Sequence, residues 1–126
     1  MTTVQRVAQI FGIVFILVAI LGFVTSGGSM EADPAMAPKI LGLFAVNVLH
    51  NLVHVVFGAW GLLASRTWDA ARSYCLAAGG IYVVLAALGF IAPTTFGLIP
   101  IGGHDIWLHA GLGAALLAAG ITAKRA

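Results

Sequence analysis

The chain has 126 residues, of which 61% are hydrophobic and only 8% are charged, and its formal net charge at pH 7 is +2. A soluble globular domain has about a quarter of its residues charged, so this composition excludes a protein with a water-exposed surface all round. The 6 basic residues are spread along the chain, which excludes a basic nucleic-acid-binding patch. The single cysteine, Cys75, excludes a cysteine-based metal or redox motif. The sequence therefore predicts an integral membrane protein whose main partner is the lipid bilayer.

Apolar stretches predict one domain, residues 1–126, built as an all-α bundle of four membrane-spanning helices. The approximate bounds of the helices are residues 7–26, 40–65, 73–92 and 105–122. The second stretch would measure about 39 Å as one helix, longer than the roughly 30 Å hydrocarbon core, so we expect it to tilt or to protrude. Segment 93–104 contains two prolines and three glycines, so we expect it to be irregular and to lie in the membrane interface or against the bundle. No long internal repeat is visible, although both halves follow a helix–loop–helix plan.

The basic residues predict the orientation of these helices. With four spans, both termini lie on the same side of the membrane. The basic residues on that side are Arg6, Arg66, Arg72, Lys124 and Arg125, and only Lys39 lies on the other. Positively charged residues concentrate in cytoplasmic loops, so we expect a multi-pass protein with cytoplasmic N- and C-termini.

The second predicted helix carries polar residues that repeat every three or four positions. Such residues share one face of a helix, and an unsatisfied polar group that faces hydrocarbon costs several kcal/mol. The polar face must therefore point into the bundle. It consists of Asn47, His50, Asn51 and His54, and the fourth helix offers a matching pair, Asp105 and His109. We expect these two sets of side chains to face each other.

The spacing of these residues favours a metal site. Two ligands one helical turn apart can reach the same metal ion, as in zinc-binding helices. His50 and His54 form one such pair, and Asp105 and His109 form another. Three imidazoles and one carboxylate suit a divalent transition metal ion such as Zn, Fe, Mn or Cu. The side chains expected to fix the imidazole tautomers by hydrogen bonds are Asn47 and Asn51.

The same residues leave other functions open. The polar face would also serve as a hydrogen-bonding contact between helices in a non-catalytic accessory or scaffold subunit, at about 0.6 kcal/mol per contact. Alternatively, the histidines would relay protons or handle a substrate in a small transporter. Haem fits less well than a metal ion, since only His54 opposite His109 would supply imidazoles from two sides. The sequence does not decide whether the protein is an enzyme, forms a homo-oligomer or has a membrane-protein partner.

Two motifs carry a resemblance to a known family. The first, N-x-x-H-N-x-x-H, runs from Asn47 to His54, and the second, D-x-W-L-H, runs from Asp105 to His109. With the apolar loop that precedes the second motif, they resemble a bacterial family of small four-helix membrane proteins known only as a domain of unknown function. The resemblance covers nearly the whole chain and implies four spans and a bacterial inner-membrane location. It implies no activity, cofactor or catalytic residue.

Overall fold

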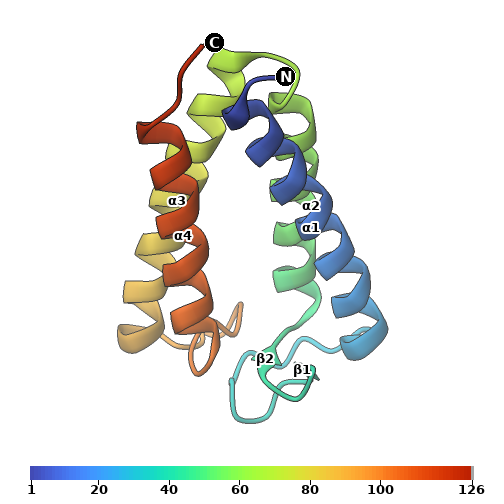
Figure 1. Cartoon of the computed structure of the whole chain (residues 1–126). Helices are drawn as coiled ribbons and strands as arrows, with labels where there is room; N and C mark the ends of the chain where they lie inside the picture. The colour runs from blue at the N-terminus through green and yellow to red at the C-terminus, as the bar shows by residue number, and fades with distance from the viewer. Residues whose placement is uncertain (126) are drawn as a thin grey trace.

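The computed structural model describes residues 1–125, which form an all-α bundle of four helices with one two-stranded hairpin (Figure 1). In chain order the elements are α1 (Thr3–Ser26), β1 (Lys39–Ile40), β2 (Phe44–Ala45), α2 (Val48–Ala64), α3 (Trp68–Ile91) and α4 (Asp105–Ile121). The start of α1 and the end of α4 lie at one end of the bundle, which we call the terminal end. The β-hairpin and residues 93–104 lie at the other, which we call the loop end. The predicted all-α, four-helix architecture is confirmed.

Helix α2 begins later than the sequence predicted. The predicted span started at residue 40, whereas β1 and β2 form an antiparallel hairpin there and the helix starts only at Val48. The turn of the hairpin includes Leu41 and Gly42, whose φ angles are 56° and 72°, and this left-handed conformation cannot continue a right-handed helix. With 17 residues, α2 is about 26 Å long. The surplus length that would have required tilting or protrusion is therefore taken up by the hairpin.

Helix α3 begins earlier than predicted, at Trp68 rather than at residue 73. The side chain of Thr67 accepts a hydrogen bond from the main-chain N–H of Ala70, and Asp69 lies in the first turn. Both features stabilise the positive, unpaired N-terminal end of a helix. Most of the segment between the second and third predicted helices, residues 66–72, is therefore the beginning of α3. The remaining helix boundaries agree with the prediction to within a few residues.

Two of the described helices, α1 and α3, are long and apolar enough to cross a membrane. Each has 24 residues, whereas α2 and α4 are apolar but have 17 residues each. Only 28% of the most apolar part of α1 is buried within the bundle. Its outward face presents Ile13, Leu17, Ile20 and Val24, all of which are exposed. Such a wide exposed apolar face is typical of a surface that meets lipid or another apolar partner.

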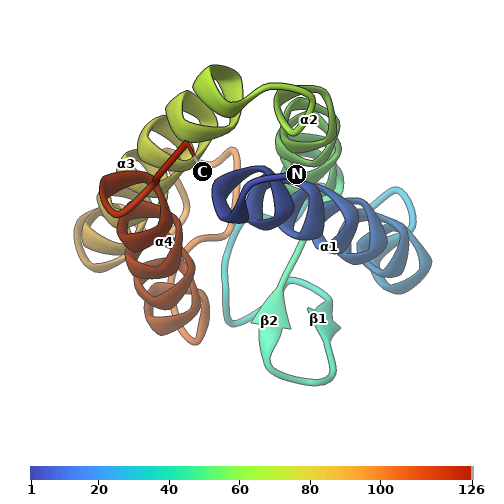
Figure 2. The ribbon, with the colours of Figure 1, turned by 45° about the horizontal axis from the view of Figure 1, so that its top comes forward.

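The helices pack as two hairpins, α1 with α2 and α3 with α4, which lie on opposite sides of the bundle (Figure 2). Within each hairpin the helices cross at a pair of glycines. A Cβ atom on Gly12 would lie 2.9 Å from the carbonyl O of Gly58, and one on Gly79 would lie 3.0 Å from the carbonyl O of Gly113. Glycine at these positions therefore lets the two backbones touch.

The two hairpins are built alike, although no long repeat is visible in the sequence. A Cβ atom on Gly12 would lie 2.8 Å from the main-chain N of Leu62, and one on Gly79 would lie 2.8 Å from the main-chain N of Leu117. Other contacts correspond in the same way. The difference in residue number between equivalent positions of α1 and α3 is constant, and so is the difference between equivalent positions of α2 and α4. The equivalent pairs include Gly12 and Gly79, Phe15 and Tyr82, Ile16 and Val83, Gly22 and Gly89, Asn51 and Ile106, Gly58 and Gly113, and Leu62 and Leu117. An approximate two-fold axis thus relates one hairpin to the other.

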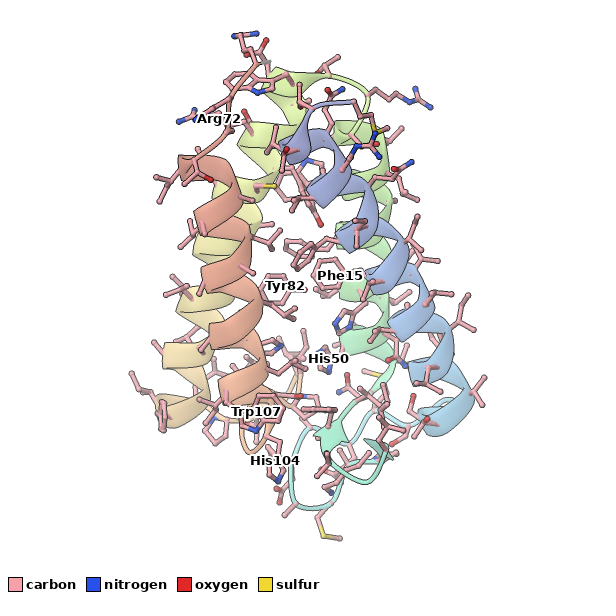
Figure 3. All side chains as sticks on the ribbon, viewed as in Figure 1. Phe15, His50, Arg72, Tyr82, His104 and Trp107 are labelled. Carbon is pink, nitrogen blue, oxygen red and sulfur yellow. The ribbon has the colours of Figure 1, made fainter. Side chains whose placement is uncertain are left out.

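The hairpins meet in an aromatic layer near the middle of the bundle. Phe15 of α1 and Tyr82 of α3 stack with ring centroids 5.4 Å apart and planes inclined by 10° (Figure 3). Phe57 of α2 packs edge-on against Tyr82 at 5.4 Å, and the hydroxyl of Tyr74 donates a hydrogen bond to the carbonyl O of Phe57 at 3.0 Å. Because Phe15 and Tyr82 are equivalent positions, the stack lies on the approximate two-fold axis.

Candidate functional site

A cluster of polar side chains lies between the hairpins, on the loop-end side of the aromatic layer (Figure 3). It contains the four candidate ligands, His50 and His54 from α2 and Asp105 and His109 from α4, which are 5%, 6%, 1% and 2% exposed. The ring centroids of His50 and His54 are 4.7 Å apart, and those of His50 and His109 are 6.1 Å apart. Asp105 lines the same cavity as the three histidines. The structure therefore brings together the side chains that the sequence expected to meet.

Main-chain carbonyl groups fix the tautomers of two of the imidazoles. The Nδ1 atom of His50 lies 3.1 Å from the carbonyl O of Ala45, and the Nδ1 atom of His54 lies 3.1 Å from the carbonyl O of His50. A carbonyl oxygen only accepts hydrogen bonds, so each Nδ1 carries the hydrogen and donates it. In the neutral imidazole the Nε2 atom then has a free lone pair. His50 and His54 therefore provide two acceptor nitrogens for a ligand.

Two further atoms of the cluster are buried and have no hydrogen-bond partner within residues 1–125. They are Oδ2 of Asp105 and Nδ1 of His109. A buried polar group without a partner costs about 1–3 kcal/mol, and native proteins contain few of them. The fold therefore encloses two polar atoms in this cluster that the described residues leave unsatisfied.

The cluster does not form a coordination sphere as it stands. In the part of the chain that the structure describes, no group of three or more His, Cys, Asp or Glu side chains has the arrangement needed to hold a metal ion. Coordination of one ion by His50, His54, Asp105 and His109 therefore stays a prediction.

The two asparagines of the polar face bond to the backbone and to Ser26 rather than to the imidazoles. Asn47 precedes α2, and its Oδ1 accepts a hydrogen bond from the main-chain N–H of His50 at 2.9 Å. Its Nδ2 donates to the carbonyl O of Leu98 at 2.8 Å. Asn51 donates to Oγ of Ser26 at 2.9 Å. The asparagines thus do not make the contacts expected of them, because main-chain carbonyl groups already occupy the Nδ1 atoms of His50 and His54.

A cavity of about 240 Å³ lies beside the cluster, between α1 and α4, and we call it the α1–α4 cavity. Its polar side chains are those of His50, His54, Asp105 and His109, and the other lining side chains are apolar. The apolar lining residues are Val18, Leu21, Ile40, Leu41, Phe44, Val46 and Leu108. The β-hairpin therefore forms the part of the wall nearest the loop end.

A second cavity of about 180 Å³ is lined mainly by α2, α3 and the loop before α4, and we call it the α2–α3 cavity. His50 and His109 line both cavities and so form a wall between them. The other lining residues are Val53, Phe57, Ile81, Tyr82, Leu85, Thr95, Ile99 and Ile101. A larger cavity of about 340 Å³ at the terminal end contains no residue of the polar cluster.

The structure adds Tyr82 to the site and leaves His104 outside it. The ring of Tyr82 lies 5.3 Å from that of His109 and lines the α2–α3 cavity. The sequence analysis missed it, and the only available signal was a hydroxyl group, which Ser73 and Tyr74 of the same helix also carry. His104 is exposed, and its Nδ1 accepts a hydrogen bond from Nε1 of Trp107 at 3.0 Å.

Replacing Asp105 with asparagine is expected to raise the free energy of unfolding by about 1 kcal/mol. A buried acid without a partner costs about 1–3 kcal/mol or more, whereas an acid in the first turn of a helix contributes only about 0.3–1 kcal/mol through the helix dipole. Burying the amide of asparagine costs less free energy than burying a carboxylate. The measurement is a titration of the protein in mixed micelles with dodecyl sulfate, followed by far-UV circular dichroism.

The control for this prediction is Asp69→Asn, which also changes an acid in the first turn of a helix. Asp69 is exposed and pairs with Arg125 at 2.9 Å, so its loss should lower stability by less than about 1 kcal/mol. A loss of stability in Asp105→Asn that exceeds the loss in Asp69→Asn would mean that the carboxyl group of Asp105 is a structural partner in the fold.

Comparisons with known proteins give a family and no activity. Residues 5–122 match a family model that is described as a domain of unknown function (DUF4383). No curated protein and no solved structure matches the chain.

Proposed function

Because the chain belongs to the DUF4383 family, whose description assigns no activity, we propose a function from the chain's own residues. The protein is a four-span membrane protein that binds a small lipid-soluble molecule with a hydroxyl head group. The molecule occupies the α1–α4 cavity, with its hydroxyl group donating a hydrogen bond to the imidazole of His54. The observation that carries this proposal is the lining of that cavity, which combines apolar walls with one group of buried polar side chains.

Several features support four spans in a bacterial inner membrane. All four helices are apolar, and α1 leaves a wide apolar face exposed. The loop end also presents large apolar side chains, since Leu41 and Phe96 are 81% and 93% exposed, which suits the membrane interface. Every basic residue except Lys39 lies near the terminal end, as expected for cytoplasmic termini. The bacterial location follows the family resemblance of the two sequence motifs.

The volume of the α1–α4 cavity limits the size of the ligand. An apolar protein cavity of about 150 Å³ binds benzene, and pockets for drug-sized molecules measure about 300–1,000 Å³. The α1–α4 cavity, at about 240 Å³, lies between these values. It therefore suits one substituted ring, and the four-ring macrocycle of haem is too large for it.

The free nitrogens define the chemistry of the head group. Nε2 of His50 and Nε2 of His54 accept hydrogen bonds, because the Nδ1 atoms donate to carbonyl groups. A ligand O–H group donates its one hydrogen to one of these acceptors, whereas an ether or a hydrocarbon donates to neither. A hydroxyl group on an aromatic ring, as in a phenol or a quinol, joins this donor to an apolar body that suits the cavity wall.

A divalent transition metal ion is a second candidate for the same nitrogens. A histidine that binds a metal ion commonly donates its other ring N–H to a carbonyl or carboxylate group, and His50 and His54 both do so. His109 and Asp105 would complete a set of ligands that suits Zn, Fe, Mn or Cu. The four side chains would have to move closer together, because no metal-holding group exists among residues 1–125. For this reason the hydroxyl-bearing ring is the leading proposal.

Equilibrium dialysis of the purified protein in detergent micelles, against empty micelles, tests the proposal with two probes. We expect 4-propylphenol to bind and 4-propylanisole, in which a methyl group replaces the hydroxyl hydrogen, to bind about tenfold more weakly. The tenfold difference corresponds to about 1.4 kcal/mol, the value of one hydrogen bond to a buried acceptor. Equal binding of the two probes would contradict the role assigned to the imidazoles.

His54→Ala should weaken the binding of 4-propylphenol about tenfold, whereas His104→Ala, which changes an exposed histidine outside the cavity, should leave it unchanged. Elemental analysis of the same samples separates the two candidates. One metal ion per chain, lost in both His54→Ala and His109→Ala, would support the metal site instead. Absence of both probe binding and metal would leave the cluster as a contact between helices, as in a scaffold subunit.

A further inference from the structure

We infer that the α2–α3 cavity is a second site for the same class of ligand, so that two hydroxyl-bearing rings bind on either side of one wall of imidazoles. The inference rests on the proposed function, from which it takes the class of ligand. It adds a site on the strength of a separate observation, the approximate two-fold axis that relates the hairpins.

The two cavities have equivalent walls. Val18 of α1 lines the α1–α4 cavity, and its equivalent, Leu85 of α3, lines the α2–α3 cavity. Leu108 of α4 and its equivalent, Val53 of α2, each line one cavity in the same way. Each cavity is also bounded by one of the two segments that connect the helices at the loop end. The axis therefore relates the cavities as well as the helices.

The second cavity also offers a polar group to a ligand. His109 occupies the position equivalent to His54, lines the α2–α3 cavity and is 2% exposed. Neither ring nitrogen has a hydrogen-bond partner in the described part of the chain, and only Nδ1 is fully enclosed by protein, so Nε2 can accept a hydrogen bond from an O–H group. The volume of about 180 Å³ exceeds the roughly 150 Å³ that holds benzene. A single phenol ring therefore meets both an apolar wall and an acceptor.

The two cavities share His50 in their common wall, and each also has another histidine as an acceptor. His50 lines both cavities but has a single free nitrogen, because its Nδ1 donates to the carbonyl O of Ala45. That nitrogen accepts from the ligand of only one cavity at a time. With both cavities filled, the hydroxyl of one ligand donates to His54 and that of the other donates to His109. Each molecule then keeps one hydrogen bond, and we expect the two sites to have similar affinity.

The number of 4-propylphenol molecules bound per chain tests the second site. We expect two in the unmodified protein, bound with similar affinity. Val18→Trp fills the α1–α4 cavity and Leu85→Trp fills the α2–α3 cavity, so each variant should bind one molecule. Leu17→Trp and Val84→Trp are matched controls, because these neighbouring residues are 59% and 57% exposed and line neither cavity. Both controls should still bind two.

The outcomes separate the second site from the first. One molecule per chain in the unmodified protein and in Leu85→Trp, with none in Val18→Trp, would overturn the second site and leave the proposed function standing. No binding to the unmodified protein would overturn the proposed function itself. Two molecules bound to Leu85→Trp would also overturn the second site. If circular dichroism shows that a tryptophan variant does not fold, Val18→Phe and Leu85→Phe narrow the same cavities and should each weaken binding at one site about tenfold.

Discussion

Replacing Gly79 with alanine is expected to lower the free energy of unfolding by about 2–3 kcal/mol. The new Cβ atom would lie 2.8 Å from the main-chain N of Leu117 and 3.0 Å from the carbonyl O of Gly113. Both atoms belong to the backbone of α4, so no change of rotamer relieves the overlap and the two helices have to separate. Helices in lipid associate through close van der Waals contact rather than through the hydrophobic effect, and separation weakens that contact. Titration with dodecyl sulfate in mixed micelles, followed by circular dichroism, measures the loss.

Gly80→Ala is the control for this prediction, because a Cβ atom on Gly80 would meet no other atom within 4 Å. Alanine also favours a helix by about 1 kcal/mol relative to glycine, so stability should stay the same or rise. Gly113→Ala should resemble Gly79→Ala, and the double variant should lose less than the sum of the two, since both changes act on one contact. Equal losses in Gly79→Ala and Gly80→Ala would contradict the packing role of Gly79.

Replacing Asn47 with alanine is expected to cost about 3 kcal/mol of stability. Asn47 is fully buried, and its Oδ1 begins α2 by accepting from the main-chain N–H of His50, a cap worth about 1 kcal/mol. Its Nδ2 donates to the carbonyl O atoms of Leu98 and Met30, and a buried carbonyl group that loses its donor costs about 1–3 kcal/mol. The same titration measures the effect, which combines loss of a helix cap with loss of a link between the connecting segments of the two hairpins.

Asn47→Ser separates these two contributions. The serine hydroxyl caps a helix about as well as asparagine, but it is too short to replace the hydrogen bond to Leu98. We expect a loss of about 2 kcal/mol, smaller than that of Asn47→Ala by the value of the cap. Stability equal to that of the unmodified protein would show that the link to Leu98 contributes nothing, and a loss equal to that of alanine would show that the cap contributes nothing.

The meeting of the polar side chains could be predicted from the sequence because two independent constraints agree. The helical period places His50 and His54 on one face of α2 and places Asp105 and His109 on one face of α4. The cost of polar groups in hydrocarbon then turns both faces inward. Neither constraint fixes how the rings are oriented, since this depends on carbonyl groups such as that of Ala45, whose position the sequence pattern does not give.

The hairpin before α2 and the role of Asn47 could not be predicted for a related reason. Ile40, Leu41 and Phe44 are as apolar as a membrane span, and a hydropathy pattern does not distinguish an apolar β-turn from the end of an apolar helix. Once the start of α2 was assigned to residue 40, Asn47 was placed within the helix instead of at its N-cap. A single wrong boundary thus changed the interpretation of a buried side chain.

The two-fold relation between the hairpins was hidden because equivalent positions hold different side chains. Phe15 corresponds to Tyr82, and His50 corresponds by position to Asp105. The equivalent residues that are identical include glycines at the crossings and the pair His54 and His109, and glycine is common in membrane helices for many reasons. The relation becomes visible only through contacts, where glycines at matching positions meet the same backbone atoms of the neighbouring helix.

The stack of Phe15 on Tyr82 has a mechanical consequence. Each hairpin is stiffened by its glycine crossing, whereas the two hairpins pack far less closely against each other. The stack therefore lies between two closely packed hairpins. A rotation of one hairpin relative to the other about this stack would separate the helices at the sides of the bundle without unwinding any of them. In the membrane location that we propose, a lipid-soluble molecule would then enter sideways between the two hairpins and reach the imidazoles without passing through water.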